Sequence, residues 1–142
     1  MPTVSSSPLL LDTCAAIWLA EGETLSPEAT QIFDNAYEKA TPVYVSPITA
    51  WEIGRLVTRG RLRLLIKPEL WLQRLVEVLN FRIAGMPPEI LFSASFLPGT
   101  PPRDSTDRIM AATAREYGYV LVTRERSLLD YANQGYIQAL EC

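Results

Sequence analysis

The chain has 142 residues, 48% of them hydrophobic, and a formal net charge of -3 at pH 7. This length allows one domain with a core and is too short for two ordinary domains. The negative charge argues against a protein held on nucleic acid by bulk electrostatics. The absence of histidine excludes histidine bases, histidine metal ligands and Ser-His-Asp chemistry.

The N-terminal region shows no export or membrane segment. Residues 1–7 carry no positively charged side chain, and we expect them to form a flexible arm. The apolar stretch at residues 9–19 is interrupted by Asp12 and is shorter than the ~20 residues that a membrane span needs. Cys14 and Cys142 lie at opposite ends of the chain and indicate neither a disulfide framework nor a zinc site. We therefore predict a cytoplasmic protein that does not bind membranes.

Taken in chain order, the hydrophobic pattern alternates between strands and helices. Short apolar runs predict strands at residues 9–11, 43–45, 81–84, 119–122 and 136–140. Apolar residues at helical spacing, several of them after Ser-Pro or Asp start signals, predict helices at residues 13–19, 26–40, 46–58, 68–79, 88–96 and 104–117. This order predicts an α/β fold, a three-layer sandwich whose parallel sheet carries helices on both faces.

Five carboxylates follow strands or lie near helix starts on the same side of the predicted sheet: Asp12, Glu52, Asp104, Asp107 and Glu125. Ligands of such sheets bind beyond the carboxyl ends of the strands, where we expect these acids to meet. Hard oxygen ligands without His or Cys select Mg²⁺ or Mn²⁺. We predict one or two such ions, with room for water and a phosphate.

Most of the acids also have a local explanation. Asp12 can cap the helix that follows it, and Asp104 with Asp107 is close to a capping box. Glu125 follows a strand, where a charged residue is commonly only solvated. Glu52 is harder to explain locally, because Ile48 and Leu56, four residues before and after it, place it on an apolar face of the predicted helix. A buried charge there needs an arginine or a metal ion.

Basic residues concentrate after residue 54, and eleven of the thirteen cations are arginine. The planar guanidinium matches phosphate, so a phosphate-bearing partner is predicted, although a solvated helix face is the alternative. The candidate contacts are Arg55, Arg59, Arg61, Arg124 and Arg126. Thr13 and Thr123 stand beside acids and are candidates to orient a carboxylate or a water, unless they only bond the local backbone.

Four segments of the chain resemble PIN-domain ribonucleases, and among them the VapC-type toxins of toxin-antitoxin pairs. These segments are residues 9–13, residues 46–53 with the following Gly60-Arg61-Leu62, residues 104–114 and residues 122–125. The chain departs from the family pattern at Ser105, where Pro is usual, and at Pro102-Arg103, which replace a His. It also carries Glu125 where the family usually has Asp.

The resemblance implies one PIN-like domain over residues 1–142, with a five-stranded parallel sheet and Mg²⁺- or Mn²⁺-dependent endonucleolytic hydrolysis of RNA by a metal-activated water. Asp12, Glu52 and Asp107 would be the catalytic metal ligands, and Asp104 and Glu125 would complete the site. A cognate antitoxin, bound in an apolar groove walled by the helix of residues 47–58 and the helix from residue 68, and a homodimer are also implied. The alternative is an inactive PIN-like module that binds RNA or protein, since Glu125 adds a methylene to the site.

Overall fold

Residues 7–142 are described by a computed structural model of the chain. The predicted flexible arm lies outside the described residues except for Ser7. That residue is buried, with 6% of its surface exposed, so the chain joins the fold one position earlier than predicted. A single domain over residues 1–142 stays a prediction.

The sheet has five parallel strands, as predicted, in the order β3 (Arg82–Ile83), β2 (Val43–Val45), β1 (Leu9–Leu11), β4 (Val120–Thr123) and β5 (Gln138–Glu141). In the register of the central strand, Leu11 lies between Val45 and Val122. The residues that follow these three positions therefore lie together at one edge of the sheet, where β1 and β2 have ended and β4 has its last residue. They are Asp12, Ser46 and Thr123.

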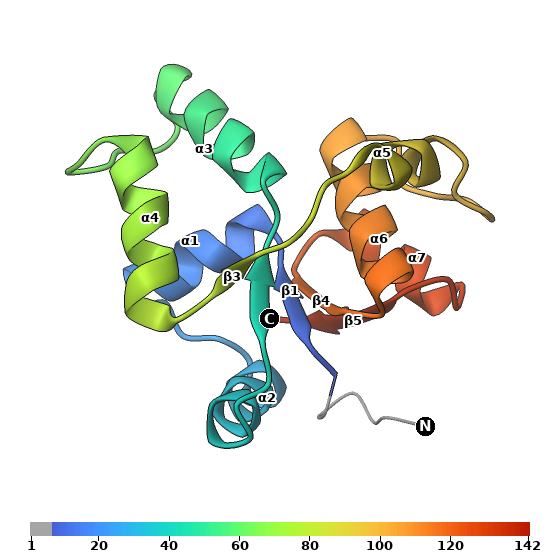
Figure 1. The fold of residues 1–142 in the computed structure, drawn as a ribbon, viewed down its shortest axis with the longest axis horizontal. Helices are drawn as coiled ribbons and strands as arrows, with labels where there is room; N and C mark the ends of the chain where they lie inside the picture. Colours follow the sequence, from blue (N-terminus) through green and yellow to red (C-terminus); the bar gives the residue numbers. More distant parts are fainter. Residues whose placement is uncertain (1–6) are drawn as a thin grey trace.

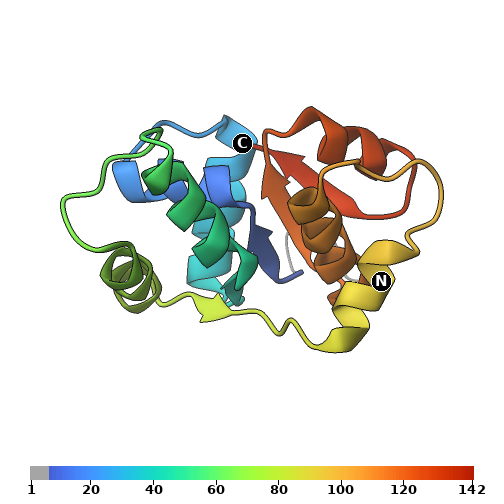
Figure 2. The same ribbon diagram turned by 90° about the horizontal axis from the view of Figure 1, so that it is seen from above.

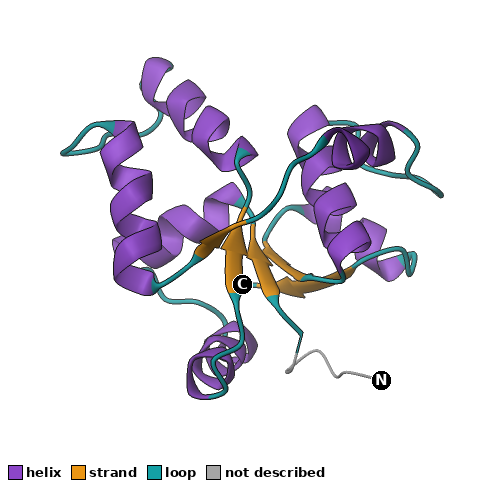
Figure 3. Ribbon diagram, in the orientation of Figure 1, coloured by secondary structure: helices purple, strands orange, loops and turns teal. Residues whose placement is uncertain are grey.

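The two faces of β1 bury alternate residues into two separate cores. Leu9 and Leu11 pack with α1 (Thr13–Glu21), α2 (Pro27–Glu38) and α4 (Pro68–Leu79) on one face. Leu10 packs on the other face with α5 (Pro88–Ser95), α6 (Ser105–Tyr117) and α7 (Arg126–Asn133). Figure 3 shows the resulting helix, sheet and helix layers, and Figure 2 shows them from above. The predicted three-layer fold is confirmed.

Helix α3 (Ile48–Thr58) rises from the end of β2, on the side of the sheet toward which the strands point (Figure 1). The first residues of α6 lie on that same side. Helices far apart in sequence thus bring their N-terminal turns to the edge where Asp12 leaves β1. None of the helices within residues 7–142 is long and apolar enough to cross a membrane.

Two local predictions need correction. Ser46 does not occupy the N-cap of α3, because that position is Pro47; instead, the Ser46 hydroxyl accepts the N–H of Ile48 at 3.2 Å. Helix α7 was not predicted, although its buried Leu128, Leu129 and Tyr131 give it a marked apolar face. The charged residues around its start concealed that pattern.

The Pro/Gly loop of residues 97–102 is tied to α7 before it enters α6. The Tyr131 hydroxyl donates to the carbonyl of Pro98 at 2.7 Å, and the Gln134 amide both donates to and accepts from the backbone of Thr100. Gly99 has φ +69°, and a Cβ there would overlap the ring of Tyr136. The loop is therefore held in one course, which fixes where Asp104 begins α6.

Candidate active site

Asp12 is a buried acid that both caps a helix and faces the edge of the sheet. Its side chain is 4% exposed, and its Oδ1 accepts the N–H of Ala15 at 2.7 Å, so the capping interpretation is correct. Its Oδ2 accepts the hydroxyl of Thr123, which itself accepts the N–H of Glu125 at 2.9 Å. Thr123 thus fixes the orientation of the Asp12 carboxylate and the course of the chain at Glu125.

Glu52 is held by hydroxyls from two other helices. Thr13 in α1 donates to Oε1 at 2.5 Å, and the Thr106 hydroxyl of α6 lies 3.2 Å from Oε2. Thr49 supports this arrangement, because its hydroxyl lies 3.1 Å from that of Thr13. The sequence required an arginine or a metal for this carboxylate. Within residues 7–142 the protein supplies hydroxyls instead, since the one ion pair found there joins Arg126 and Asp130.

The first turn of α6 carries two acids in different environments. Asp104 is the exposed N-cap, and its Oδ1 accepts the N–H groups of Thr106 and Asp107 at 2.9 and 3.0 Å. The hydrogen bond from the Thr106 hydroxyl is the main reason that the pKa of Asp104 is lowered. Asp107 is half-buried, and Ser127 donates to its Oδ2 at 3.3 Å.

Burial, with a smaller contribution from neighbouring acids, raises the pKa of two of the carboxyls. Burial raises the pKa of Asp12 to about 6 despite the hydrogen bonds that lower it, and the charges of Glu125 and Glu52 add to the rise. Burial also raises the pKa of Asp107 to about 7, with Asp104 and then Glu125 as the next causes. Carboxylates from four segments of the chain thus share one negative region.

Cys14 lies inside this negative region. Its Sγ is 4.0 Å from Glu125 Oε1. The pKa of this thiol is raised to about 12, chiefly by burial and in addition by four nearby carboxylates, those of Asp12, Glu125, Glu52 and Asp107. The thiol therefore stays protonated at neutral pH and offers neither a nucleophile nor a thiolate ligand.

The donor set fits a hard divalent cation, since it consists of carboxylate oxygens with a raised pKa at two of them. Within residues 7–142, however, no three acidic or cysteine side chains close around a common point as a ready metal cage. The carboxylates are tied to hydroxyl and backbone donors instead. Such spacing suits Mg²⁺, which keeps several waters and takes few direct protein ligands.

Three of the predicted arginines border the acids. A pocket of about 230 Å³ is lined by Thr13, Cys14, Glu52, Arg55, Leu56, Arg59, Arg61 and Glu125. Arg55 also lies 4.6 Å from the exposed ring of Trp51, and its charge helps to lower the pKa of Asp104. The pocket therefore joins the carboxylates to groups that suit phosphate.

The other two predicted arginines make contacts within the fold. The Arg124 guanidinium lies 3.7 Å over the ring of Trp18 and donates to the carbonyls of Cys142 at 3.1 Å and Thr24 at 3.4 Å. Arg126 pairs with Asp130 at 3.9 Å on the surface of α7. Arg124 thus helps to fasten the C-terminus, and neither arginine lines the pocket beside Glu52.

Sequence reasoning missed Thr49, Thr106 and Ser127. Thr49 lies three residues before Glu52 and is fully buried, and Thr106 stands between two predicted acids. Their positions in the sequence were informative, but polar residues at these positions are equally common in ordinary helix starts. Thr49 and Thr106 contribute to the hydrogen bonds around Glu52 only because α1, α3 and α6 pack close together.

Comparison with known proteins places the chain in a family. The family model of the PIN domain matches residues 9–134, and the chain therefore belongs to the PIN domain family. It is 38% identical over 121 residues to Ribonuclease VapC22 of Mycobacterium tuberculosis (strain ATCC 25618 / H37Rv), a match that covers 84% of this chain and 88% of that relative. The resemblance to VapC-type ribonucleases is confirmed.

Two solved structures share the fold. One is VapBC2 from Rickettsia felis bound to a DNA fragment from their promoter, with a TM-score of 0.62, 15% identity and coverage of 94% of this chain and 98% of the other. The second is FitAcB from Neisseria gonorrhoeae, with a TM-score of 0.50, 21% identity and coverage of 93% and 96%. At these identities the likeness concerns the fold alone.

The raised pKa of Asp12 predicts an unusual pH dependence of the metal-free protein. A carboxyl whose folded pKa exceeds its unfolded value favours the folded state most below the unfolded value of 3.8, and this contribution is lost as pH rises through about 6. Asp12→Asn removes the charge. In EDTA, the free energy of unfolding of this variant, taken relative to wild type, should be about 1–3 kcal/mol larger at pH 8 than at pH 4.5, so the variant gains stability as the pH rises.

Urea denaturation at the two pH values measures this difference. Asp34→Asn, at an exposed position of α2, is the matched control and should show little change between them. If the free energy of unfolding of Asp12→Asn, taken relative to wild type, were smaller at pH 8 than at pH 4.5, the assignment of a destabilising buried charge to Asp12 would be contradicted.

Proposed function

We propose that the protein is an endoribonuclease, the toxin of a VapBC-type toxin-antitoxin pair, and that it hydrolyses RNA phosphodiester bonds with the help of Mg²⁺ or Mn²⁺. The carrying observation is the group of mutually repelling carboxylates at the edge where Asp12 leaves the sheet. Membership of the PIN domain family and similarity to a ribonuclease over most of the chain support the same activity. The shared fold with the solved VapBC2 structure supports an antitoxin as partner.

Asp12, Glu52 and Asp107 would hold the cation, and Asp104 and Glu125 would take part directly or through water. A bound divalent ion supplies two effects here: it lowers the pKa of an attacking water and offsets charge on the leaving oxygen. The residues of the chain supply orientation. Threonine hydroxyls fix Glu52 and Asp12, and the fastened loop fixes the start of α6.

Arg55, Arg59 and Arg61 would bind the RNA backbone in the pocket beside Glu52. Guanidinium groups at this place position a phosphate next to the carboxylates without reading the base sequence. They also offset part of the repulsion between the acidic edge and a polyanion. A chain with a net charge of -3 could therefore still bind RNA, because three of its arginines line the pocket where the substrate would lie.

Glu52→Gln tests the catalytic proposal, because it removes the charge of a carboxylate that hydroxyls of two other helices hold, with little change in shape. Cleavage of RNA by the purified protein should fall by at least about 100-fold. EDTA should stop the wild-type reaction, and Mg²⁺ or Mn²⁺ should restore it. Glu38→Gln, at the exposed C-terminal end of α2, should cleave as wild type does.

The competing proposal is an inactive binding module. Two observations favour it: Glu125 stands where the family usually has Asp, and no three acidic or cysteine side chains within residues 7–142 form a ready metal site. Two results together would favour it: the wild-type protein cleaves RNA no better than the Glu52→Gln variant, and it binds no Mn²⁺ saturably. Full activity of the Glu52→Gln variant would contradict the proposed mechanism directly.

The double substitution Arg59→Gln with Arg61→Gln tests the proposed RNA contacts. KM should rise about tenfold while kcat changes little, because these groups bind the substrate before and during the reaction alike. The dependence of log Kd on log salt should lose about 1.4 in slope if two phosphate contacts are removed. Arg74→Gln in α4 is the control, and an equal effect there would show that only total charge matters.

The antitoxin would bind an apolar groove of about 280 Å³. The groove is lined by residues 19, 20, 66, 71, 74, 75, 78 and 79, so its walls are α1 and α4, and it shares α4 with the groove predicted between α3 and α4. Val78, which is 79% exposed, and Leu79 offer apolar surface to an amphipathic segment. Helices α1 and α4, which line the groove, lie on the opposite side of the molecule from α5 (Figure 1).

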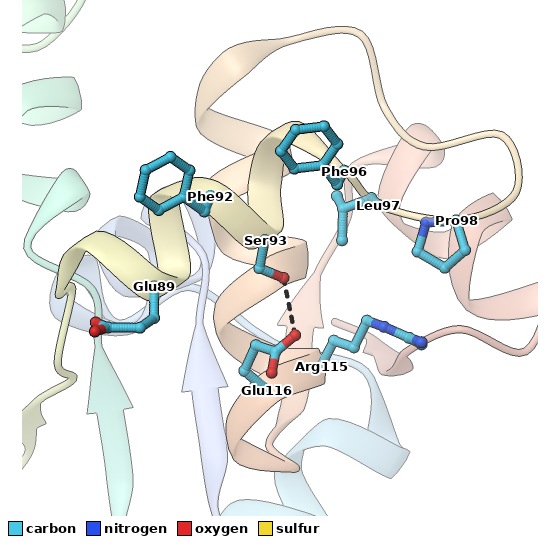
Figure 4. Close-up of a pocket in the computed structure, with 8 residues that line it drawn as sticks. All are labelled: Glu89, Phe92, Ser93, Phe96, Leu97, Pro98, Arg115 and Glu116. Atoms are coloured by element: carbon cyan, nitrogen blue, oxygen red, sulfur yellow. Dashed lines mark hydrogen bonds between the residues drawn. The ribbon is translucent and has the colours of Figure 1, made fainter.

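The homodimer would form through α5. Phe92 and Phe96 lie one helical turn apart and are 65% and 81% exposed. They border a hollow of about 550 Å³ with Glu89, Arg115 and Glu116, in which Ser93 donates to Glu116 at 2.9 Å (Figure 4). An exposed apolar pair flanked by charges of both signs suits a two-fold contact between identical surfaces.

The double substitution Phe92→Ser with Phe96→Ser should convert a dimer into a monomer of 15.9 kDa in light scattering after size-exclusion chromatography. The control Leu65→Ser removes a fully exposed apolar residue between α3 and α4 and should leave the dimer intact. A double variant that still dimerises would show that α5 is not the interface.

A further inference from the structure

Thr106 joins two acids that come from different parts of the chain. Its side chain is buried, and its hydroxyl lies 3.2 Å from Glu52 Oε2 and makes a short hydrogen bond with Asp104 Oδ1. Glu52 belongs to α3, whereas Asp104 is the N-cap of α6. We propose that Thr106 is a positioning residue that sets the spacing of Glu52 and Asp104 for the divalent cation, an inference that rests on the proposed function.

Both carboxylates are already fixed on their other contacts. Glu52 Oε1 accepts from Thr13, and Asp104 Oδ1 accepts two backbone N–H groups of α6. Neither carboxylate can therefore turn away from Thr106 without losing a hydrogen bond. The threonine hydroxyl is the one link between these two anchored groups that the described contacts contain.

The hydroxyl of Thr106 cannot donate to both carboxylates at once. A hydroxyl has one proton, so it can donate to Glu52 or to Asp104, and the other carboxylate then faces the oxygen of the hydroxyl. A cation bound to one carboxylate removes this conflict. It neutralises that carboxylate, and the hydroxyl of Thr106 can then donate its proton to the other one. Thr106 thus couples the two acids, so that binding of a cation at one is favoured by the presence of the other.

The same helix provides a matched control. Thr113 is fully buried in α6, but its hydroxyl donates to the carbonyl of Ile109 at 2.7 Å within the helix. Thr113→Val therefore removes a buried threonine hydroxyl of α6 without touching either acid. Thr106→Ser keeps the hydroxyl at the bridging position, and Thr106→Val and Thr106→Ala remove it with and without retention of volume.

Calorimetric titration of the full chain with Mn²⁺ tests the inference without relying on cleavage. Thr106→Val and Thr106→Ala should weaken Mn²⁺ binding about tenfold, the loss expected when a residue that orients a ligand is removed. Thr106→Ser should stay within about threefold of wild type, and Thr113→Val within about twofold. Thermal melting in EDTA checks that each variant is folded.

A cycle with Glu52→Gln separates positioning from a general structural role. If Thr106 acts through the Glu52 carboxylate, Thr106→Val should change Mn²⁺ affinity by less than about twofold in the Glu52→Gln background. The inference is overturned if Thr106→Val binds Mn²⁺ as wild type does, if Thr106→Ser loses as much as Thr106→Val, or if the loss persists undiminished in that background. A wild-type protein that binds no Mn²⁺ overturns the proposed function itself.

Discussion

Burial of neighbouring carboxylates at one edge of the parallel sheet, without an arginine among the described residues that pairs with them, is the constraint on which the rest of this structure depends. Burial and neighbouring acids raise the pKa of Asp12 to about 6 and that of Asp107 to about 7. Within residues 7–142 no arginine forms an ion pair with either acid. Threonine hydroxyls and helix N–H groups hold the carboxylates in place, which orients the charge but does not cancel it. Such an arrangement costs stability unless a cation completes it.

The topology produces this concentration of charge. Because β1 lies between β2 and β4 in register, the chain leaves the sheet at Asp12 and at Thr123 side by side. The first turns of α3 and α6 reach the same edge, so Glu52 and Asp104 approach across a gap that only Thr106 spans among the described contacts. The fold thereby brings acids from distant parts of the chain into one negative region, and three arginines after Glu52 line the pocket beside it.

The strands, the layers and the edge occupied by the acids could be predicted from the sequence, because buried parallel strands and capped helices leave strong local patterns. The hydroxyl contacts of Glu52 could not, because they depend on how closely α1, α3 and α6 approach. Arg124 shows the same limit: the sequence did not indicate that its guanidinium lies over the ring of Trp18 and donates to the carbonyl of Cys142, and its predicted phosphate contact stays a prediction. The antitoxin groove proposed from the structure lies between α1 and α4, whereas the position between α3 and α4 that the sequence indicated stays a prediction.

A crystal grown with Mn²⁺ and measured at the manganese absorption edge would test the account most directly. We expect an anomalous peak within ligand or water-bridged distance of Asp12, Glu52 and Asp107, with the threonine contacts of Glu52 retained. Absence of a peak at this edge of the sheet at saturating Mn²⁺, or a peak bound only by surface acids elsewhere, would contradict the claim that these carboxylates are arranged to share a cation.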